Sequence, residues 1–137
     1  MPTLAGKVTT NFRWSEMECH STPPVPVPDE YHDNARAVCR ELERVRRICG
    51  NKPLEVTRVY STPEHNAAVG GAPRSQHLTA NAADVVPPVE GMTTNDLGRI
   101  VQVIASEPES RIRFIKVYPG HVHFDLRQRQ TLLVEGF

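Results

Sequence analysis

Two histidines and one aspartate, His77, Asp84 and His123, carry the kinds of side chain that a catalytic zinc ion binds. Imidazole nitrogens and carboxylate oxygens are common zinc donors, and three protein ligands leave the fourth tetrahedral position free for water or substrate. A structural zinc site would normally close that position, most often with thiolates. The residue types therefore predict a zinc hydrolase in which these three side chains hold Zn2+.

The segment around His123 alternates between polar and apolar side chains. Residues 121–126 are His, Val, His, Phe, Asp and Leu. Because successive side chains of a strand point to opposite faces, a strand here would place His121, His123 and Asp125 on one face and the apolar side chains on the other. Metal binding would explain so polar a face on an otherwise apolar strand.

Asp84 lies in the apolar run of residues 82–86, which predicts a second short strand that ends at Pro87. A buried carboxylate is costly unless it is paired or bound to a metal. Taken singly, Asp84 is better explained as a turn or cap residue, and His77 as a residue of a surface loop. Taken together with His123, they favour a metal site, although short motifs carry a risk of false matches.

Longer stretches around these residues resemble the M15 zinc peptidases. Ser75 to Asp84 resembles the family signature Ser-x-His-x-x-Gly-x-Ala-x-Asp, and Thr62 to His77 resembles the run that leads into it. Val117 to Asp125 resembles the segment with the third ligand, and Asn11 to Met17 resembles the opening helix. The resemblance covers about residues 11–127, and its motifs are specific.

This resemblance implies a fold, a ligand set and an activity. The family contains D-Ala-D-Ala carboxypeptidases and L-Ala-D-Glu endopeptidases, which cut peptidoglycan stem peptides and occur in many phage lysins. Its fold is of the hedgehog/DD-peptidase-like α+β type. By resemblance, His77, Asp84 and His123 would bind Zn2+, and a peptidoglycan peptide would be the substrate. His121, the first histidine of the His-x-His pair, would face that substrate.

Two positions depart from the family pattern. The family usually has Ser-Gly-Tyr-Arg before the proline that matches Pro63, whereas residues 58–61 here are Arg, Val, Tyr and Ser. Ser61 thus replaces the arginine expected to stabilise the developing oxyanion, and Arg58 lies three residues earlier on a predicted strand. Ala80 replaces the signature glycine, and it would be strained if the backbone there needs a positive φ.

Other polar residues near these motifs are candidates for catalysis. His121 is the candidate for proton transfer or for contact with the transition state, because it shares a face with His123. Asp125 would orient one of the imidazoles through a hydrogen bond or would be a carboxylate that faces solvent, and both readings stay open. The candidates for contacting a substrate carboxylate or the oxyanion are Arg58, Ser61, Tyr60 and Arg74.

Length and composition are those of one small domain. A chain of 137 residues is long enough for a single core, and we expect one domain over residues 1–137. Lys plus Arg and Asp plus Glu both number 16, and a net charge of zero argues against nucleic acid as a partner. No apolar run reaches the length of a membrane span. Residues 1–7 lack an apolar signal core, which predicts synthesis in the cytoplasm and action on the cell wall after release or within a virion.

The three cysteines, Cys19, Cys39 and Cys49, include no Cys-x-x-Cys pair. Cys39 and Cys49 fall on one predicted helix, about 15 Å apart along its axis, which is too far for a disulfide bond. We interpret them as small buried hydrophobes. Cys19 with His20 is expected to belong to a loop rather than to a second metal site.

Hydrophobic periodicity predicts an α+β fold in which helices pack on one face of a small antiparallel sheet. A first helix is predicted to begin at a capping box formed by Ser15 and Glu18. Longer helices are predicted from within 29–34 to Gly50 and from Thr94, as the cap, to about residue 106, with a short one after Thr62. Strands are predicted at 54–60, 82–86, 112–118 and 122–127, the last two forming a hairpin.

Residues 128–137 are predicted to be an adaptable C-terminal tail, whose apolar side chains would dock on a protein partner or on their own domain. This tail and the replacements at Ser61 and Ala80 support a second hypothesis. The chain would then be a catalytically impaired peptidase fold that serves as a structural or binding component, for instance of a virus particle. Turnover of muropeptides would distinguish the two hypotheses, whereas metal content would not.

Overall fold

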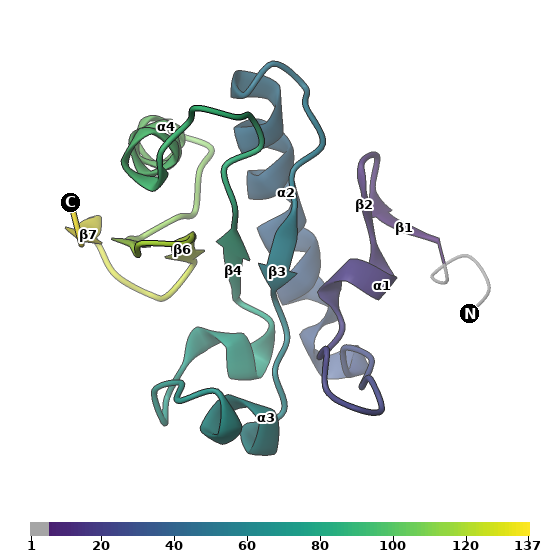
Figure 1. Cartoon of the computed structure of the whole chain (residues 1–137). Helices are drawn as coiled ribbons and strands as arrows, with labels where there is room; N and C mark the ends of the chain where they lie inside the picture. Colours follow the sequence, from purple (N-terminus) through teal and green to yellow (C-terminus); the bar gives the residue numbers. More distant parts are fainter. Residues whose placement is uncertain (1–5) are drawn as a thin grey trace.

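A computed structural model describes residues 6–137, so the prediction about an N-terminal signal core falls mostly on residues outside the described part. The fold is α+β, as predicted, with helices on one face of a central sheet (Figure 1). In chain order the elements are β1 (Lys7–Thr9), β2 (Phe12–Arg13), α1 (Trp14–Met17), a 3-10 turn (Asp29–Tyr31), α2 (His32–Ile48), β3 (Val56–Arg58), α3 (Pro63–Ala68), a second 3-10 turn (Gln76–Thr79), β4 (Ala82–Val85), α4 (Thr94–Ala105), β5 (Phe114–Val117), β6 (Val122–Asp125) and β7 (Leu133–Glu135).

The central sheet has five strands in the order β3-β4-β6-β5-β7. Strands β3, β4, β6 and β5 pair antiparallel with their neighbours, and this confirms the predicted antiparallel sheet and its β5–β6 hairpin. The outermost strand, β7, pairs parallel with β5. The sheet is therefore mixed, because the chain crosses over after β6 to add a strand that the sequence did not predict.

The strand register places charged and polar residues opposite one another across the sheet. Arg58 is opposite Asp84, Asp84 is opposite His123, and His123 is opposite Lys116. Lys116 is in turn opposite Glu135 on the edge strand. Because directly opposite residues on neighbouring strands project to the same face, a polar row crosses all of the strands on one face of the sheet.

The two long helices cover the other face. Figure 1 shows α2 running behind β3 and β4, and α4 lies against β5 and β6. On α2, Val38, Leu42 and Val45 form a stripe with no exposed surface. Its apolar side chains form one core with Phe124 and other inward-facing side chains of the strands. The apolar half of each strand thus anchors the sheet and leaves the polar row facing outward.

The cap of the short helix α3 agrees with the prediction. The Thr62 hydroxyl accepts a hydrogen bond from the His65 N–H at 3.1 Å, and Pro63 occupies the first helical position. Proline is suited to this position because its missing N–H would have no helical partner there. The cap fixes the direction in which the chain leaves β3 toward the site.

The two other predicted caps are wrong by one or two residues. Helix α4 is capped by Thr93, whose hydroxyl accepts from the Asp96 N–H while the Asp96 carboxylate accepts from the Thr93 N–H, each at 3.0 Å. Thr94 is therefore already helical. Helix α1 begins at Trp14, because the Glu16 carboxylate accepts a hydrogen bond of 2.7 Å from the backbone N–H of Arg13. The pair at α4 is reciprocal, whereas at α1 only the bond to Glu16 is made, because the arginine side chain of the N-cap has no acceptor.

The C-terminal tail contains an ordered strand rather than a fully adaptable segment. Leu133 and Val134 of β7 are partly buried, and the Leu133 N–H donates to the Arg113 carbonyl at 3.0 Å. Next to it, the Phe137 ring lies under the Arg99 guanidinium at 5.3 Å. Of the two predicted docking places, the structure shows the chain's own domain, and a protein partner for the tail stays a prediction.

Three further predictions concern single residues or short segments. All three cysteines are free, with Cys19 and Cys39 buried and Cys49 partly buried, in agreement with their interpretation as small hydrophobes. The β1–β2 hairpin was not predicted. Of the helices within residues 6–137, none is long and apolar enough to span a membrane.

Candidate metal centre and active site

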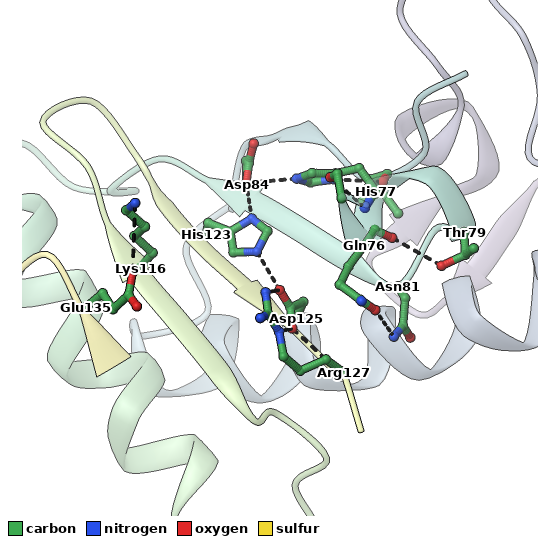
Figure 2. Close-up of polar contacts among 12 residues, drawn as sticks. Gln76, His77, Thr79, Asn81, Asp84, Lys116, His123, Asp125, Arg127 and Glu135 are labelled. Atoms are coloured by element: carbon green, nitrogen blue, oxygen red, sulfur yellow. Dashed lines mark hydrogen bonds and ion pairs between the residues drawn. The ribbon is translucent and has the colours of Figure 1, made fainter. Parts of the chain in front are cut away.

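Donor atoms from three separate segments meet on the polar face of the sheet. His77 Nε2 lies 3.2 Å from Asp84 Oδ1, and His123 Nδ1 lies 3.0 Å from the same oxygen. Figure 2 shows both imidazoles directed at the Asp84 carboxylate. One ligand atom from each residue lies within 4.8 Å of the other two. This arrangement offers a metal ion two nitrogens and one carboxylate oxygen, a donor set that suits zinc.

The second nitrogen of each imidazole has an acceptor of its own. His77 Nδ1 lies 2.9 Å from the Val59 carbonyl oxygen, and His123 Nε2 lies 2.7 Å from Asp125 Oδ2. Because a carbonyl and an ionised carboxylate can only accept, these two nitrogens carry the protons. The other two nitrogens face Asp84 Oδ1 and are the ones that would bind a metal, and histidine ligands commonly have such a partner behind them. The residues present therefore fit a zinc ion.

A tight turn delivers His77 to this point. The Ser75 hydroxyl accepts from the His77 N–H at 3.1 Å and begins the 3-10 turn. Ala80 ends it in the left-handed region, with φ 57° and ψ 34°, and no part of its side chain is exposed. The prediction of strain at this position is thus confirmed, since such a conformation costs a non-glycine residue about 1–2 kcal/mol. Figure 2 also shows the bond from the Asn81 amide to Gln76 Oε1, 2.8 Å long, that joins the two ends of this turn.

The charges at the centre favour an ionised Asp84. Burial alone would raise the pKa of Asp84, but hydrogen bonds with His123 and His77 outweigh it and hold that pKa below its usual range. Burial alone would lower the pKa of His123, but hydrogen bonds with Asp125 and Asp84 outweigh it and raise that pKa. A carboxylate must be ionised to bind a metal, and Asp84 meets this condition.

The donor atoms open into a pocket of about 630 Å³. This volume lies within the range of pockets that bind small molecules. Besides the donors, its lining residues include Tyr60, Ser61, His65 and Tyr118. Of the candidates predicted for substrate contact, Tyr60 therefore lines the pocket, whereas Arg74 is exposed and is not a lining residue. The pocket leaves the donor atoms accessible to a bound molecule.

His121 lies beside the donors without joining them. Its Nε2 is 3.8 Å from Asp84 Oδ2, and its ring stacks on Tyr118 with centroids 4.6 Å apart and an interplanar angle of 14°. A separation of 3.8 Å is too long for a hydrogen bond, and the side chain keeps 33% of its surface exposed. His121 thus shares the face of His123, as predicted, and is free to meet a bound molecule.

Arg58 and Ser61 are in direct contact. Arg58 donates from Nε to Ser61 Oγ at 2.7 Å and from Nη2 to Asn66 Oδ1 at 2.5 Å. A Cβ on Gly71 would lie 2.1 Å from Asn66 Oδ1, so a glycine is needed beside this cluster. Burial lowers the pKa of Arg58, and the charge of Asp84 partly offsets this effect. The guanidinium lines the pocket and takes no carboxylate partner within hydrogen-bonding distance among residues 6–137.

Asp125 supports His123 rather than facing solvent. Its side chain is fully buried, and it contacts His123 as described above. The side chain of Arg127, a residue missed in the prediction of the site, makes two further bonds to the same carboxylate, at 2.8 and 2.9 Å. The alternation that joins residues 121, 123 and 125 would have reached Arg127 if extended by one more step.

The fold and the donor set agree with the comparison to known proteins. A family model described as Peptidase M15 matches residues 10–125, which include all three metal donors and His121. A search of curated proteins gives no match. Peptidases of this family depend on a metal ion, and the His-Asp-His group supplies a place for one. The chain therefore belongs to the peptidase M15 family.

Proposed function

We propose that this protein is a zinc-dependent peptidase that cleaves short peptidoglycan stem peptides, as a carboxypeptidase or an endopeptidase. The observation that carries the proposal is the convergence of His77 Nε2, Asp84 Oδ1 and His123 Nδ1 in an open pocket of a peptidase-family chain. The choice of peptidoglycan as substrate rests on the sequence motifs around these residues.

His77, Asp84 and His123 would hold Zn2+, which when bound acidifies water and polarises the scissile carbonyl. Each of the two histidines is held in place by a neighbour. The Val59 carbonyl fixes the ring of His77, and Asp125 fixes the ring of His123. Rigid support of this kind matters because small displacements of reacting groups greatly slow catalysis.

His121 is the proposed proton carrier. It takes the proton from the attacking water and delivers a proton to the leaving amine, steps for which imidazole is well suited near neutral pH. Its place beside Asp84, its exposure to the pocket and its stacking on Tyr118 support this role. The stacking restricts the ring without occupying either nitrogen.

Arg58 is the proposed group for the oxyanion or for a substrate carboxylate. Its guanidinium has neutral partners on Nε and Nη2, so its positive charge is available to an anion in the pocket. Ser61 supports this role because its hydroxyl oxygen accepts a hydrogen bond from Nε and so orients the guanidinium. Removal of one oxyanion donor typically slows a reaction about 10²–10³-fold, which is the loss we expect for Arg58→Ala.

The proposal is tested by incubating the purified protein with peptidoglycan and with defined muropeptides, and by measuring fragment masses with and without a chelator. A carboxypeptidase would release the terminal D-alanine, and an endopeptidase would cut within the stem peptide. Chelation should stop either reaction and added zinc should restore it. If protein fully loaded with zinc releases nothing from any type of peptidoglycan, the enzymatic proposal fails, and a structural or binding role replaces it.

A further inference from the structure

Asp125 is a carboxylate without any exposed surface, and all of its partners lie in one small cluster. Its Oδ2 accepts from His123 Nε2 at 2.7 Å and from Arg127 Nη2 at 2.9 Å. Its Oδ1 accepts from Arg127 Nε at 2.8 Å and from the Arg127 backbone N–H at 3.2 Å. A buried carboxylate is stable only when its charge is matched, and Arg127 supplies that match.

The guanidinium of Arg127 is itself held from the other side. It lies 3.9 Å from the centroid of the Phe114 ring. The same ring meets His123 edge-on, with centroids 5.7 Å apart and an interplanar angle of 65°. The four side chains therefore form a closed cluster in which Arg127 and His123 both contact Asp125 and Phe114. Figure 2 shows the polar part of this cluster, with Asp125 between the imidazole and the guanidinium.

We propose that Arg127 is a positioning residue for the metal centre and acts through Asp125. A two-pronged pair between arginine and carboxylate fixes orientation as well as charge. Asp125 held in this way presents Oδ2 to His123 Nε2, and the ring then presents Nδ1 to the point where the other two donors meet. This inference rests on the proposed zinc site and adds a residue to it.

Arg127 also lines the pocket, so direct contact with a substrate is the competing role. Two observations favour positioning. The side-on pair of N–H groups, on Nε and Nη2, is already bonded to Asp125, so a substrate could reach only the N–H groups of Nη1 and the second one of Nη2. The face of the guanidinium is also covered by Phe114. An arginine whose main role is substrate binding would instead leave this side-on pair free for the ligand.

The test is the zinc affinity of the full chain, measured by competition with a chelating dye, for Arg127→Met and Arg127→Lys. Loss of a partner behind a histidine ligand typically weakens metal binding about 10–100-fold, which is the loss we expect for Arg127→Met. Arg127→Lys keeps the charge but not the fork and should lose less. The matched control is Arg129→Met, at an exposed arginine whose one side-chain hydrogen bond within residues 6–137 is to the Thr131 carbonyl, and its affinity should not change.

A second comparison shows whether the effect passes through Asp125. In an Asp125→Asn background, adding Arg127→Met should change zinc affinity by no more than about twofold, because coupled residues do not give additive losses. Co2+ bound in place of zinc should report the altered donor geometry of Arg127→Met in its visible spectrum. Circular dichroism shows whether Arg127→Met folds. If it does not fold, Arg127→Lys becomes the deciding variant, and wild-type zinc affinity in Arg127→Lys would overturn the inference.

The inference is also overturned if Arg127→Met folds, binds zinc as tightly as the wild type and only raises KM. That result would assign Arg127 to substrate binding. Failure of the underlying site would look different, because the wild-type protein itself would then fail to bind zinc. Arg127→Met that binds zinc less tightly while wild-type protein binds it well supports the positioning role.

Discussion

Replacement of His121 by alanine separates proton transfer from metal binding. The His121 imidazole makes no hydrogen bond to the metal donors, since its nearest approach is 3.8 Å to Asp84 Oδ2. The bonds that orient His77 and His123 do not involve it. We therefore expect His121→Ala to bind zinc within about twofold of the wild type, as is usual for a substitution outside the supporting contacts.

The effect on turnover should be much larger. Loss of a positioned proton-transfer group typically costs about 10²–10⁴ in rate, which corresponds to about 2.7–5.4 kcal/mol of activation free energy. Because the proposed step occurs after binding, kcat should fall while KM changes little. The matched control is His20→Ala, which removes an imidazole that lines the same pocket but makes no ion pair with Asp84.

The assay is release of a muropeptide fragment under saturating zinc, together with a zinc titration of each variant. A His121→Ala protein with wild-type kcat would refute the role in proton transfer. A His121→Ala protein that has lost zinc would show instead that His121 is a ligand. Equal losses of kcat in His121→Ala and His20→Ala would mean that removal of any imidazole from the pocket slows the reaction, and that His121 has no special role.

The remaining predictions concern the metal, the backbone and the charges. His123→Ala should lose zinc and activity together, measured by metal analysis and turnover, and a variant that keeps both would remove it from the ligand set. Ala80→Gly should leave the free energy of unfolding, measured with urea, within about 1 kcal/mol of the wild type. The substitution relieves about 1–2 kcal/mol of backbone strain. It also loses a buried methyl group, worth about 0.8 kcal/mol, and makes the unfolded chain more flexible. Ser61→Arg should slow turnover, because its guanidinium would meet that of Arg58, and the exchange Arg58→Ser with Ser61→Arg should recover part of the loss. Burial would raise the pKa of Glu43, but hydrogen bonds to the β1–β2 hairpin outweigh burial and lower that pKa. The stability from these bonds is therefore present above the ordinary pKa of 4.5 and is lost as the pH falls through the lowered pKa. Unfolding measured at pH 5 and at pH 3, with Glu43→Gln as the control, checks this.

The candidate metal centre could be predicted because its residues lie in short segments with strong local patterns. Strict alternation predicted strand β6 and the common face of His121 and His123, and both are observed. The apolar run around Asp84 predicted β4. What alternation could not provide is the pairing of the two strands, which sets Asp84 opposite His123 and depends on contacts distant in the sequence.

Features that depend on such distant contacts were missed. Strand β7 has only three residues and is ordered because β5 lies beside it, so no local pattern marks it. Glu41 is another example, since it is almost fully buried in a helix face that looks solvent-exposed from its charges. Its carboxylate accepts from the Ser110 hydroxyl at 2.9 Å and from the Arg111 N–H at 2.8 Å, partners that lie far along the chain.

The exchange of residues between positions 58 and 61 shows where sequence comparison and geometry differ. Ser61 occupies the position where the family usually has an arginine, and this replacement supported the hypothesis of an impaired enzyme. In the structure the side chain of Arg58 reaches Ser61 and lines the pocket, so a guanidinium is present next to the metal donors. A long, flexible side chain can reach the same place from a different backbone position, which a comparison of aligned residues does not reveal.

The central claim is that peptide cleavage depends on a metal held by His77, Asp84 and His123. Its most direct test is the rate of muropeptide cleavage by chelator-stripped protein as zinc is added back. The account predicts no cleavage by the stripped protein and a rate that rises with zinc until one ion per chain is bound. Undiminished cleavage by fully stripped protein, or a zinc-loaded protein that never cleaves, would contradict it.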